Sequence, residues 1–160
     1  MTHPVETALV ETIHHYLDQA SHLLGVLEQH SDAEALMAVC VAPDSLDTGL
    51  HLAVAMQFAA RALCLPGGDP VPEIDEPVSL RSLRALQASA TGALSTAPEL
   101  DWTARVQHTA GEAQLDQPVA DYIARFALPN MLFHLTMAYA GLRHGGLRIG
   151  KVDFDGMHEY

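Results

Sequence analysis

The chain has 160 residues, a formal net charge of −12 and only eight lysine and arginine residues. That charge argues against partners such as nucleic acid or an anionic membrane, because both attract basic surfaces. With 49% hydrophobic residues the chain is too apolar for a disordered segment, and its length suits one domain over residues 1–160.

The N-terminal segment lacks the basic stretch followed by an apolar stretch that is typical of a secretory signal. No uncharged apolar run of about 18 residues is present, so we predict no transmembrane helix. Cys40 and Cys64 fall in predicted helices and fit reduced core thiols better than a disulfide or a reactive thiol. These features favour a cytoplasmic protein.

Apolar side chains recur every three or four residues over residues 5–30, which predicts an amphipathic first helix. Another face of this helix carries Glu11, His15, Asp18 and His22, again three or four residues apart. This set could bind a metal at the surface. A solvated face with weak ion pairs is the commoner meaning of such a pattern.

The second long helix is predicted over residues 45–63, with Asp44 as its N-terminal cap. Before it, Ser31 and Glu34 have the spacing of a capping box, which predicts a short helix. His51 lies on the apolar stripe of the second long helix and should face inward.

Asp47 lies one turn before His51 and either orients its imidazole, acts as a ligand, or forms a plain Asp–His pair. Residues 65–78 contain four prolines, two glycines and four acidic residues, a composition that predicts a loop. Ser79 is expected to cap a third helix over residues 80–96.

Residues 102–115 have the one non-helical pattern of the chain. Their partial alternation on either side of a Thr-Ala-Gly-Glu turn suits a short two-stranded hairpin packed on helices. The tail over residues 147–160 is predicted to be irregular and to be held by Arg148, Lys151 and Asp153.

The longest apolar-periodic segment is residues 117–146, which predicts a fourth long helix. Pro118 suits its first turn, and Gly145 and Gly146 suit a left-handed end. Pro129 in its interior removes a backbone hydrogen bond and predicts a kink. The predicted core face of this helix consists of Val119, Ile123, Phe126, Asn130, His134, Met137 and Gly141.

Asn130 and His134 follow the predicted kink and lie four residues apart on that face. This spacing stacks two side chains on a helix and is the spacing that a pair of metal ligands needs. Alternatively, His134 is an ordinary core histidine and Asn130 satisfies carbonyls freed by the proline. Four long helices predict a bundle, in which His51 would approach Asn130 and His134.

Four segments also carry a resemblance to a known family: VAPDSLDTGLHLA at 41–53, DYIARFALPNMLFH at 121–134, AYAGLRHGG at 138–146 and IGKVDFDG at 149–156. In this order and spacing they resemble an uncharacterised bacterial and fungal family of the DinB-like (YfiT-like) superfamily, from about residue 5 to 156. The resemblance implies an all-α four-helix bundle with up-up-down-down topology and a homodimer.

The DinB-like superfamily holds candidate metalloenzymes, some acting as thiol-dependent transferases or isomerases. Its usual metal site is one histidine on the second helix and a His-x-x-x-His pair on the fourth. Mapped onto this chain, the site comprises His51 and His134, with Asn130 in place of the first histidine of the pair. The resemblance thus implies a divalent metal such as zinc or nickel. An amide oxygen binds these metals less well than imidazole, so Asp47 or His144 would have to join.

Three functions remain open at the level of sequence. In a metal-dependent enzyme, His51 and His134 would hold the ion, and Tyr139 or His144 would move protons. The sequence indicates no substrate and no reaction class.

In a non-catalytic bundle, Asn130 and His134 would bind a polar small molecule against an apolar wall of Phe126, Phe133 and Met137. In the third alternative these polar residues are structural, and the protein acts through a dimer surface.

Overall fold

The structure, a computed structural model, describes residues 4–97 and 99–159, and the other residues of the predicted 1–160 domain lie outside this description. The described chain is mostly helical, with one two-stranded antiparallel sheet. In chain order its elements are α1 (Pro4–Glu28), α2 (Ala33–Met37), α3 (Thr48–Gly67), α4 (Leu80–Thr96), β1 (Arg105–Ala110), β2 (Ala113–Pro118), α5 (Val119–Tyr122), the π-helical turn η1 (Ile123–Ala127), α6 (Leu128–His144) and α7 (Lys151–Asp155).

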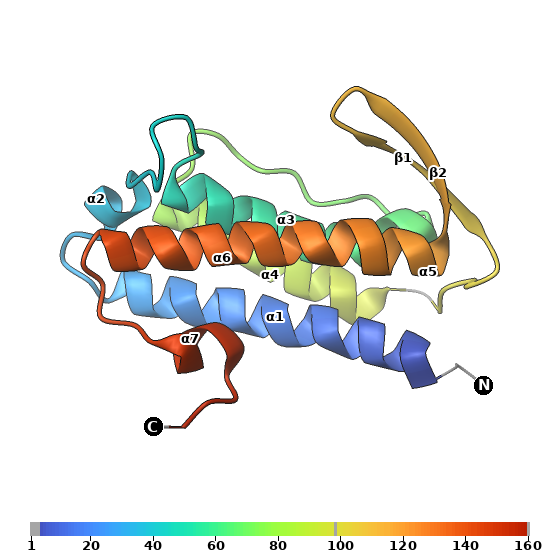
Figure 1. Cartoon of the computed structure of the whole chain (residues 1–160), viewed down its shortest axis with the longest axis horizontal. Helices are drawn as coiled ribbons and strands as arrows, with labels where there is room; N and C mark the ends of the chain where they lie inside the picture. The colour runs from blue at the N-terminus through green and yellow to red at the C-terminus, as the bar shows by residue number, and fades with distance from the viewer. Residues whose placement is uncertain (1–3, 98, 160) are drawn as a thin grey trace.

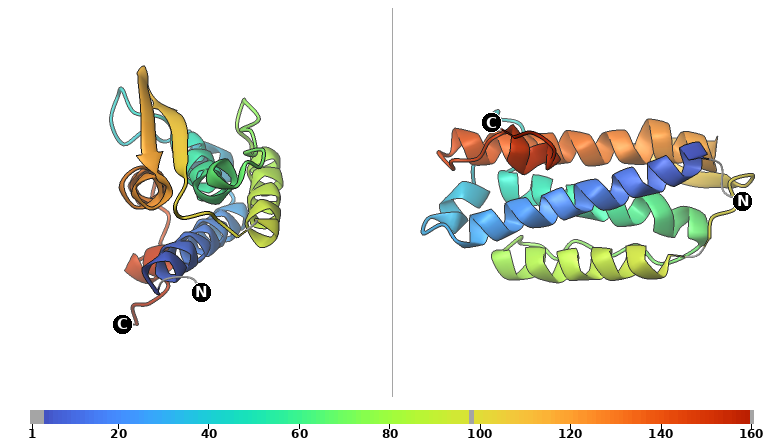
Figure 2. Two further views of the ribbon diagram at one scale, coloured as in Figure 1. Left: turned by 90° about the vertical axis from the view of Figure 1, so that its right-hand side faces the viewer. Right: turned by 90° about the horizontal axis from the view of Figure 1, so that it is seen from below.

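The long helices α1, α3, α4 and α6 lie side by side along the length of the molecule (Figures 1 and 2). α5 and η1 lead into α6 at the end where the hairpin stands. The predicted hairpin is confirmed: β1 and β2 pair antiparallel, with Ala110 opposite Ala113 at the turn. Val106 and His108 are the buried residues of β1. One face of β1 therefore packs against the helices.

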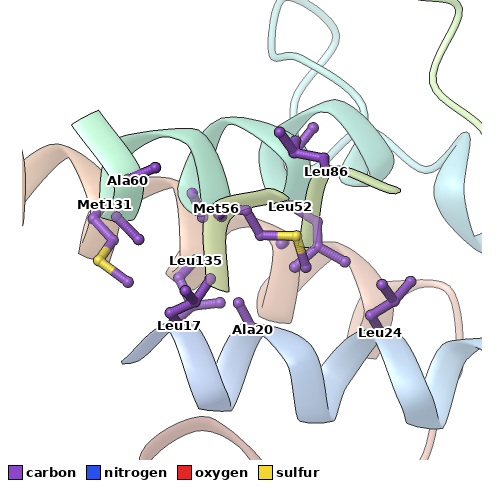
Figure 3. Close-up of a cluster of buried hydrophobic side chains, with 14 of the residues drawn as sticks. Leu17, Ala20, Leu24, Leu52, Met56, Ala60, Leu86, Met131 and Leu135 are labelled. Atoms are coloured by element: carbon purple, nitrogen blue, oxygen red, sulfur yellow. The ribbon is translucent and has the colours of Figure 1, made fainter. Parts of the chain in front are cut away.

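α3 is the central helix, and it contacts α1, α4 and α6. Its many alanines let three helices approach its axis, and larger residues such as Leu52 and Met56 fill the space between them (Figure 3). By length and composition α3 is apolar enough to cross a membrane, but 67% of its most apolar window is buried inside the protein. That burial is typical of the core helix of a globular protein.

α3 and α6 come closest at Gly141. A Cβ atom built on Gly141 would lie 2.0 Å from the hydroxyl oxygen of Thr48. That hydroxyl is fixed because it donates a hydrogen bond of 2.7 Å to the carbonyl of Val39. Glycine is therefore the residue that lets the two backbones cross here.

The π turn η1 changes which face of α6 meets the core. The buried residues along this segment are Val119, Tyr122, Ile123, Ala127, Met131, Leu135, Ala138, Gly141 and Leu142. The predicted face is wrong from Phe126 to Met137, because a π turn holds one extra residue and rotates the following helix relative to a regular 3.6-residue period. Gly141, at the end of the predicted face, is buried as expected. Asn130 and His134 are consequently half-buried at the edge of the core.

One predicted N-cap is wrong and another is confirmed. Asp47, rather than Asp44, caps the second long helix: its Oδ1 accepts a hydrogen bond of 2.7 Å from the Leu50 N–H. Ser79 caps α4 as predicted, in a reciprocal capping box with Ser82.

The capping box predicted at Ser31 is not formed. α2 begins after Asp32, whose side chain makes no capping hydrogen bond, and the Asp32 N–H instead donates to Nδ1 of His30. Both cysteines are free, but Cys40 is exposed outside any helix, so only Cys64 is a core thiol.

The tail is more ordered than predicted, because it contains the short helix α7 packed on α1. His15 Nε2 donates a hydrogen bond of 2.7 Å to the carbonyl of Asp155, and His22 Nε2 lies 2.8 Å from Oδ1 of Asp153. Two imidazoles of the face predicted as a surface metal site or solvated surface therefore hold the tail. Within residues 4–97 and 99–159, no three His, Cys, Asp or Glu side chains are grouped to hold a metal.

Candidate functional site

His51 of α3 and His134 of α6 meet across the interface between these two helices. Their Nδ1 atoms are 2.9 Å apart, although the residues are separated by 83 positions in the chain. His51 is buried, with 3% of its surface exposed, and His134 is half-buried. The sequence placed both residues on inward faces, and the structure brings their rings together.

Both imidazoles are held in the neutral form. Burial, and to a smaller extent the neighbouring His51, lowers the pKa of His134 to about 4. Burial also lowers the pKa of His51, while the carboxylate of Asp47 opposes that shift. Neutral imidazole is the form that accepts a hydrogen bond or binds a metal ion.

The short contact requires that one Nδ1–H donates and that the other Nδ1 accepts. Nε2 of His51 is then left buried with no hydrogen-bond partner among the described residues. A buried polar atom without a partner costs free energy, on the order of 1–3 kcal/mol. The pair is therefore poorly explained as a purely stabilising device.

Aromatic rings surround the histidine pair. Phe58 of α3 stacks on His134 with ring centroids 6.1 Å apart and planes 13° apart. Phe133 meets both imidazoles edge-on, yet 56% of its surface is exposed. The pair is thus shielded on the side of Phe58 and lies closest to solvent on the side of Phe133.

Asn130 does not turn toward the histidines. Its Nδ2 donates a hydrogen bond of 2.7 Å to the carbonyl of Phe126, within the π turn that precedes Pro129. The geometry agrees with the alternative in which Asn130 satisfies a carbonyl of the distorted turn. Its Oδ1 makes no hydrogen bond within the described part of the chain, so the amide retains a free acceptor.

The other predicted pocket residues are not gathered around the pair. Asp47 is used as the cap of α3. Tyr139 packs on Phe154 of α7 and accepts a hydrogen bond from Arg143. His144 is exposed at the end of α6, about 15 Å along the helix from His134 at a rise of 1.5 Å per residue.

Phe126 and Met137, predicted as the apolar wall, lie on either side of His134 along the chain. Phe126 packs on Phe58, with ring centroids 5.8 Å apart. Met137 is half-buried. Of the predicted wall, Phe133 contacts both imidazoles, whereas Phe126 contacts Phe58, which stacks on His134.

His108 of β1 is a site residue that the sequence did not single out. The centroid of its ring lies 4.3 Å from the ring centroid of Phe126 and 4.9 Å from that of Tyr122. Its Nε2 pairs with Oε1 of Gln117 at 2.7 Å, and its Nδ1 is buried without a partner in the described chain. The alternation of Val106 and His108 in β1 was the available signal, because it places both on the inward face.

The site fits a divalent cation only in part. Two nitrogens that bind the same ion at about 2.1 Å are about 3 Å apart when the two bonds form a right angle. This separation is close to the 2.9 Å between the two Nδ1 atoms. A tetrahedral ion would separate them by about 3.4 Å. Among the described residues no third His, Cys, Asp or Glu joins the pair. Solvent or a bound molecule would have to complete the coordination.

Comparisons with known proteins agree with this fold. A family model described as "Domain of unknown function (DUF1993)" matches residues 6–155. The crystal structure of a DinB family member protein from Shewanella denitrificans is similar, with a TM-score of 0.76 and 23% sequence identity over 94% of this chain and 91% of that chain. No curated protein sequence matches the chain.

Proposed function

The chain belongs to the DUF1993 family, an uncharacterised DinB-like family, and we propose that it is a metal-dependent enzyme with a reduced ligand set. His51 and His134 would hold one divalent cation, such as zinc or nickel. The proposal rests on the distance of 2.9 Å between two neutral Nδ1 atoms, one from His51 of α3 and one from His134 of α6. When bound, such an ion would polarise a carbonyl or lower the pKa of a bound water or thiol.

The residues of this chain have separate tasks in the proposed site. His51 and His134 supply neutral nitrogens, because burial keeps both unprotonated near pH 7. Phe58 fixes the plane of His134 by stacking and keeps water away from that side. Asn130 has no direct task in this site, because its amide is bonded to the carbonyl of Phe126.

A second candidate is a bundle without metal, in which the histidines form a neutral hydrogen bond that joins α3 to α6. The same 2.9 Å distance is normal for an N–H···N hydrogen bond. The use of Asn130 to satisfy the Phe126 carbonyl also favours this candidate. Such a protein would bind a small molecule without catalysis or act through a dimer surface.

Metal binding separates the two candidates. Protein purified without a metal-affinity tag, stripped with a chelator and titrated calorimetrically with Ni²⁺ or Zn²⁺, should bind one ion per chain. His134→Ala should abolish this binding, whereas His144→Ala, on the exposed end of the same helix, should leave it unchanged.

Restoring the ligand pair provides a gain-of-function test. Asn130→His recreates the His-x-x-x-His spacing and should tighten the metal affinity at least tenfold, because imidazole is a better ligand than an amide oxygen. If the wild type binds no ion and Asn130→His does, the scaffold is competent but the natural site is not metal-dependent. If His134→Ala binds as well as the wild type, the proposed site is wrong.

The finer points of architecture are part of this proposal. We infer that the four long helices form one bundle domain, which their side-by-side packing supports. The expected up-up-down-down order is wrong, because α1 and α6 run in one direction and α3 and α4 run in the other (Figure 1). We also infer a homodimer in the cytoplasm. Light scattering after size-exclusion chromatography tests the dimer: a monomer at all concentrations would contradict it.

A further inference from the structure

A cavity of about 290 Å³ lies beside the N-terminal half of α1 and is also lined by residues that follow α4. Figure 1 shows the end of α4 and the start of α1 at the same end of the molecule. Its lining residues include none of the histidine-pair site. The proposed function does not account for it.

The walls of the cavity are apolar. Leu63 and Leu94 form part of them and are continuous with the core, with 3% and 5% of their surfaces exposed. Trp102, the single tryptophan of the chain, adds a half-buried aromatic wall. The volume equals that of about ten water molecules at roughly 30 Å³ each, which suits a ligand of about ten non-hydrogen atoms.

The rim of the cavity is acidic. Glu6, Glu11 and Glu99 line it, and no lysine or arginine does within residues 4–97 and 99–159. Glu11 and Glu99 are exposed and form no salt bridge or hydrogen bond with any described residue. His14 is the remaining titratable side chain at the cavity. Carboxylates above an apolar wall concentrate negative potential and attract cations.

We propose that this cavity binds a small hydrophobic ammonium compound. Its apolar body lies against Leu63 and Leu94, and its positive head lies among the carboxylates of Glu11 and Glu99. Trp102 contributes because the face of an indole ring attracts a cation. A carboxylate ligand would be repelled by the rim, and a neutral ligand of the same shape would gain only the apolar contacts.

Three compounds with the same phenyl body test the charge selectivity: phenethylammonium, 2-phenylethanol and phenylacetate. Binding is followed by the fluorescence of Trp102, which reports on the cavity alone because the chain has no other tryptophan. We expect phenethylammonium to bind with a dissociation constant on the order of 1 mM or tighter. The alcohol should bind more weakly, and phenylacetate should not bind measurably.

Substitutions in the rim and the wall locate the binding. Glu11→Gln and Glu99→Gln should each weaken phenethylammonium binding by about three- to fivefold, as for exposed charge pairs, without changing 2-phenylethanol binding. Ala97→Leu places a larger side chain in the cavity and should weaken both ligands at least tenfold. If Ala97→Leu does not fold, Thr7→Phe fills the cavity from the exposed face of α1 instead.

The proposal fails if the alcohol binds as tightly as the amine, or if none of the three compounds changes the fluorescence of Trp102. It also fails if both carboxylate substitutions leave the affinity for phenethylammonium unchanged. None of these outcomes bears on metal binding by the histidine pair, so the two proposals are tested separately.

Discussion

α3 and α6 meet in two different ways within a few turns of each other. At Thr48 and Gly141 the contact is made by small groups in close approach, and the Thr48 hydroxyl has a hydrogen-bond partner. Around His51, Phe58 and His134 the contact is made by rings, and one ring nitrogen is buried without a partner. The first contact is explained by packing alone. The second retains polar groups that packing does not require, which is the behaviour expected of a functional site.

The largest expected effect on stability is at the close contact between Thr48 and Gly141. Gly141→Ala should lower the free energy of unfolding by about 2–3 kcal/mol, because the new Cβ would overlap the fixed hydroxyl of Thr48. Gly25→Ala is the matched control: Gly25 lies inside α1, with nothing within 4 Å of its Cβ position. That control should stabilise the protein by about 0.5–1 kcal/mol. Urea denaturation measures both. Equal effects of the two substitutions would show that the close crossing is not rigid.

The contact between the rings of His51 and His134 should make the free energy of unfolding depend on pH. In metal-free protein the His134 pKa is about 4, whereas the imidazole of an unfolded chain titrates near 6.5. Between these values the unfolded state binds a proton that the folded state does not, so stability falls as pH falls from 6.5 toward 4. The His134 contribution lost over this range should be about 1–3 kcal/mol.

The measurement compares urea denaturation of the wild type and of His134→Phe from pH 7 to pH 4, with a chelator present. The difference between the two curves reports on the histidine pair, because the carboxylates contribute equally to both. The wild type should lose more stability than the variant. Parallel curves would mean that His134 is protonated as readily in the folded chain as in the unfolded one.

The smallest effect is expected at the π turn. Asn130→Ala removes the hydrogen bond to the Phe126 carbonyl and should lower the free energy of unfolding by about 1 kcal/mol. Thr136→Ala, at an exposed position of the same helix, should change it by less than about 0.5 kcal/mol. An Asn130→Ala protein as stable as the wild type would show that water replaces the amide at that carbonyl.

Much of the fold was accessible from sequence, because long apolar periods define α1, α3, α4 and α6 almost to their ends. The inward position of His51 followed from the same pattern. The face of α6 could not be predicted in full, since a regular period assumes 3.6 residues per turn and η1 departs from it. Pro129 signalled a distortion but not its kind.

Other features depend on tertiary contacts that have no local signal. Asp44 and Asp47 are equally good caps by residue type, and the position where α3 begins decides between them. The direction of the Asn130 amide depends on which carbonyl the π turn leaves open. His108 contacts the rings of Tyr122 and Phe126 only because β1 folds back onto α3 and η1.

The attachment of α7 to α1 has a consequence for the order of folding during synthesis. His15 and His22 find their partners 140 and 131 residues later in the chain, so these are among its most non-local contacts. A ribosome adds roughly 5–20 residues per second, and α1 must therefore wait several seconds before α7 exists to cover it. During that interval one side of the first helix remains available to other molecules, including chaperones. The closing of the tail is thus a late event, separate from the packing of the helical core.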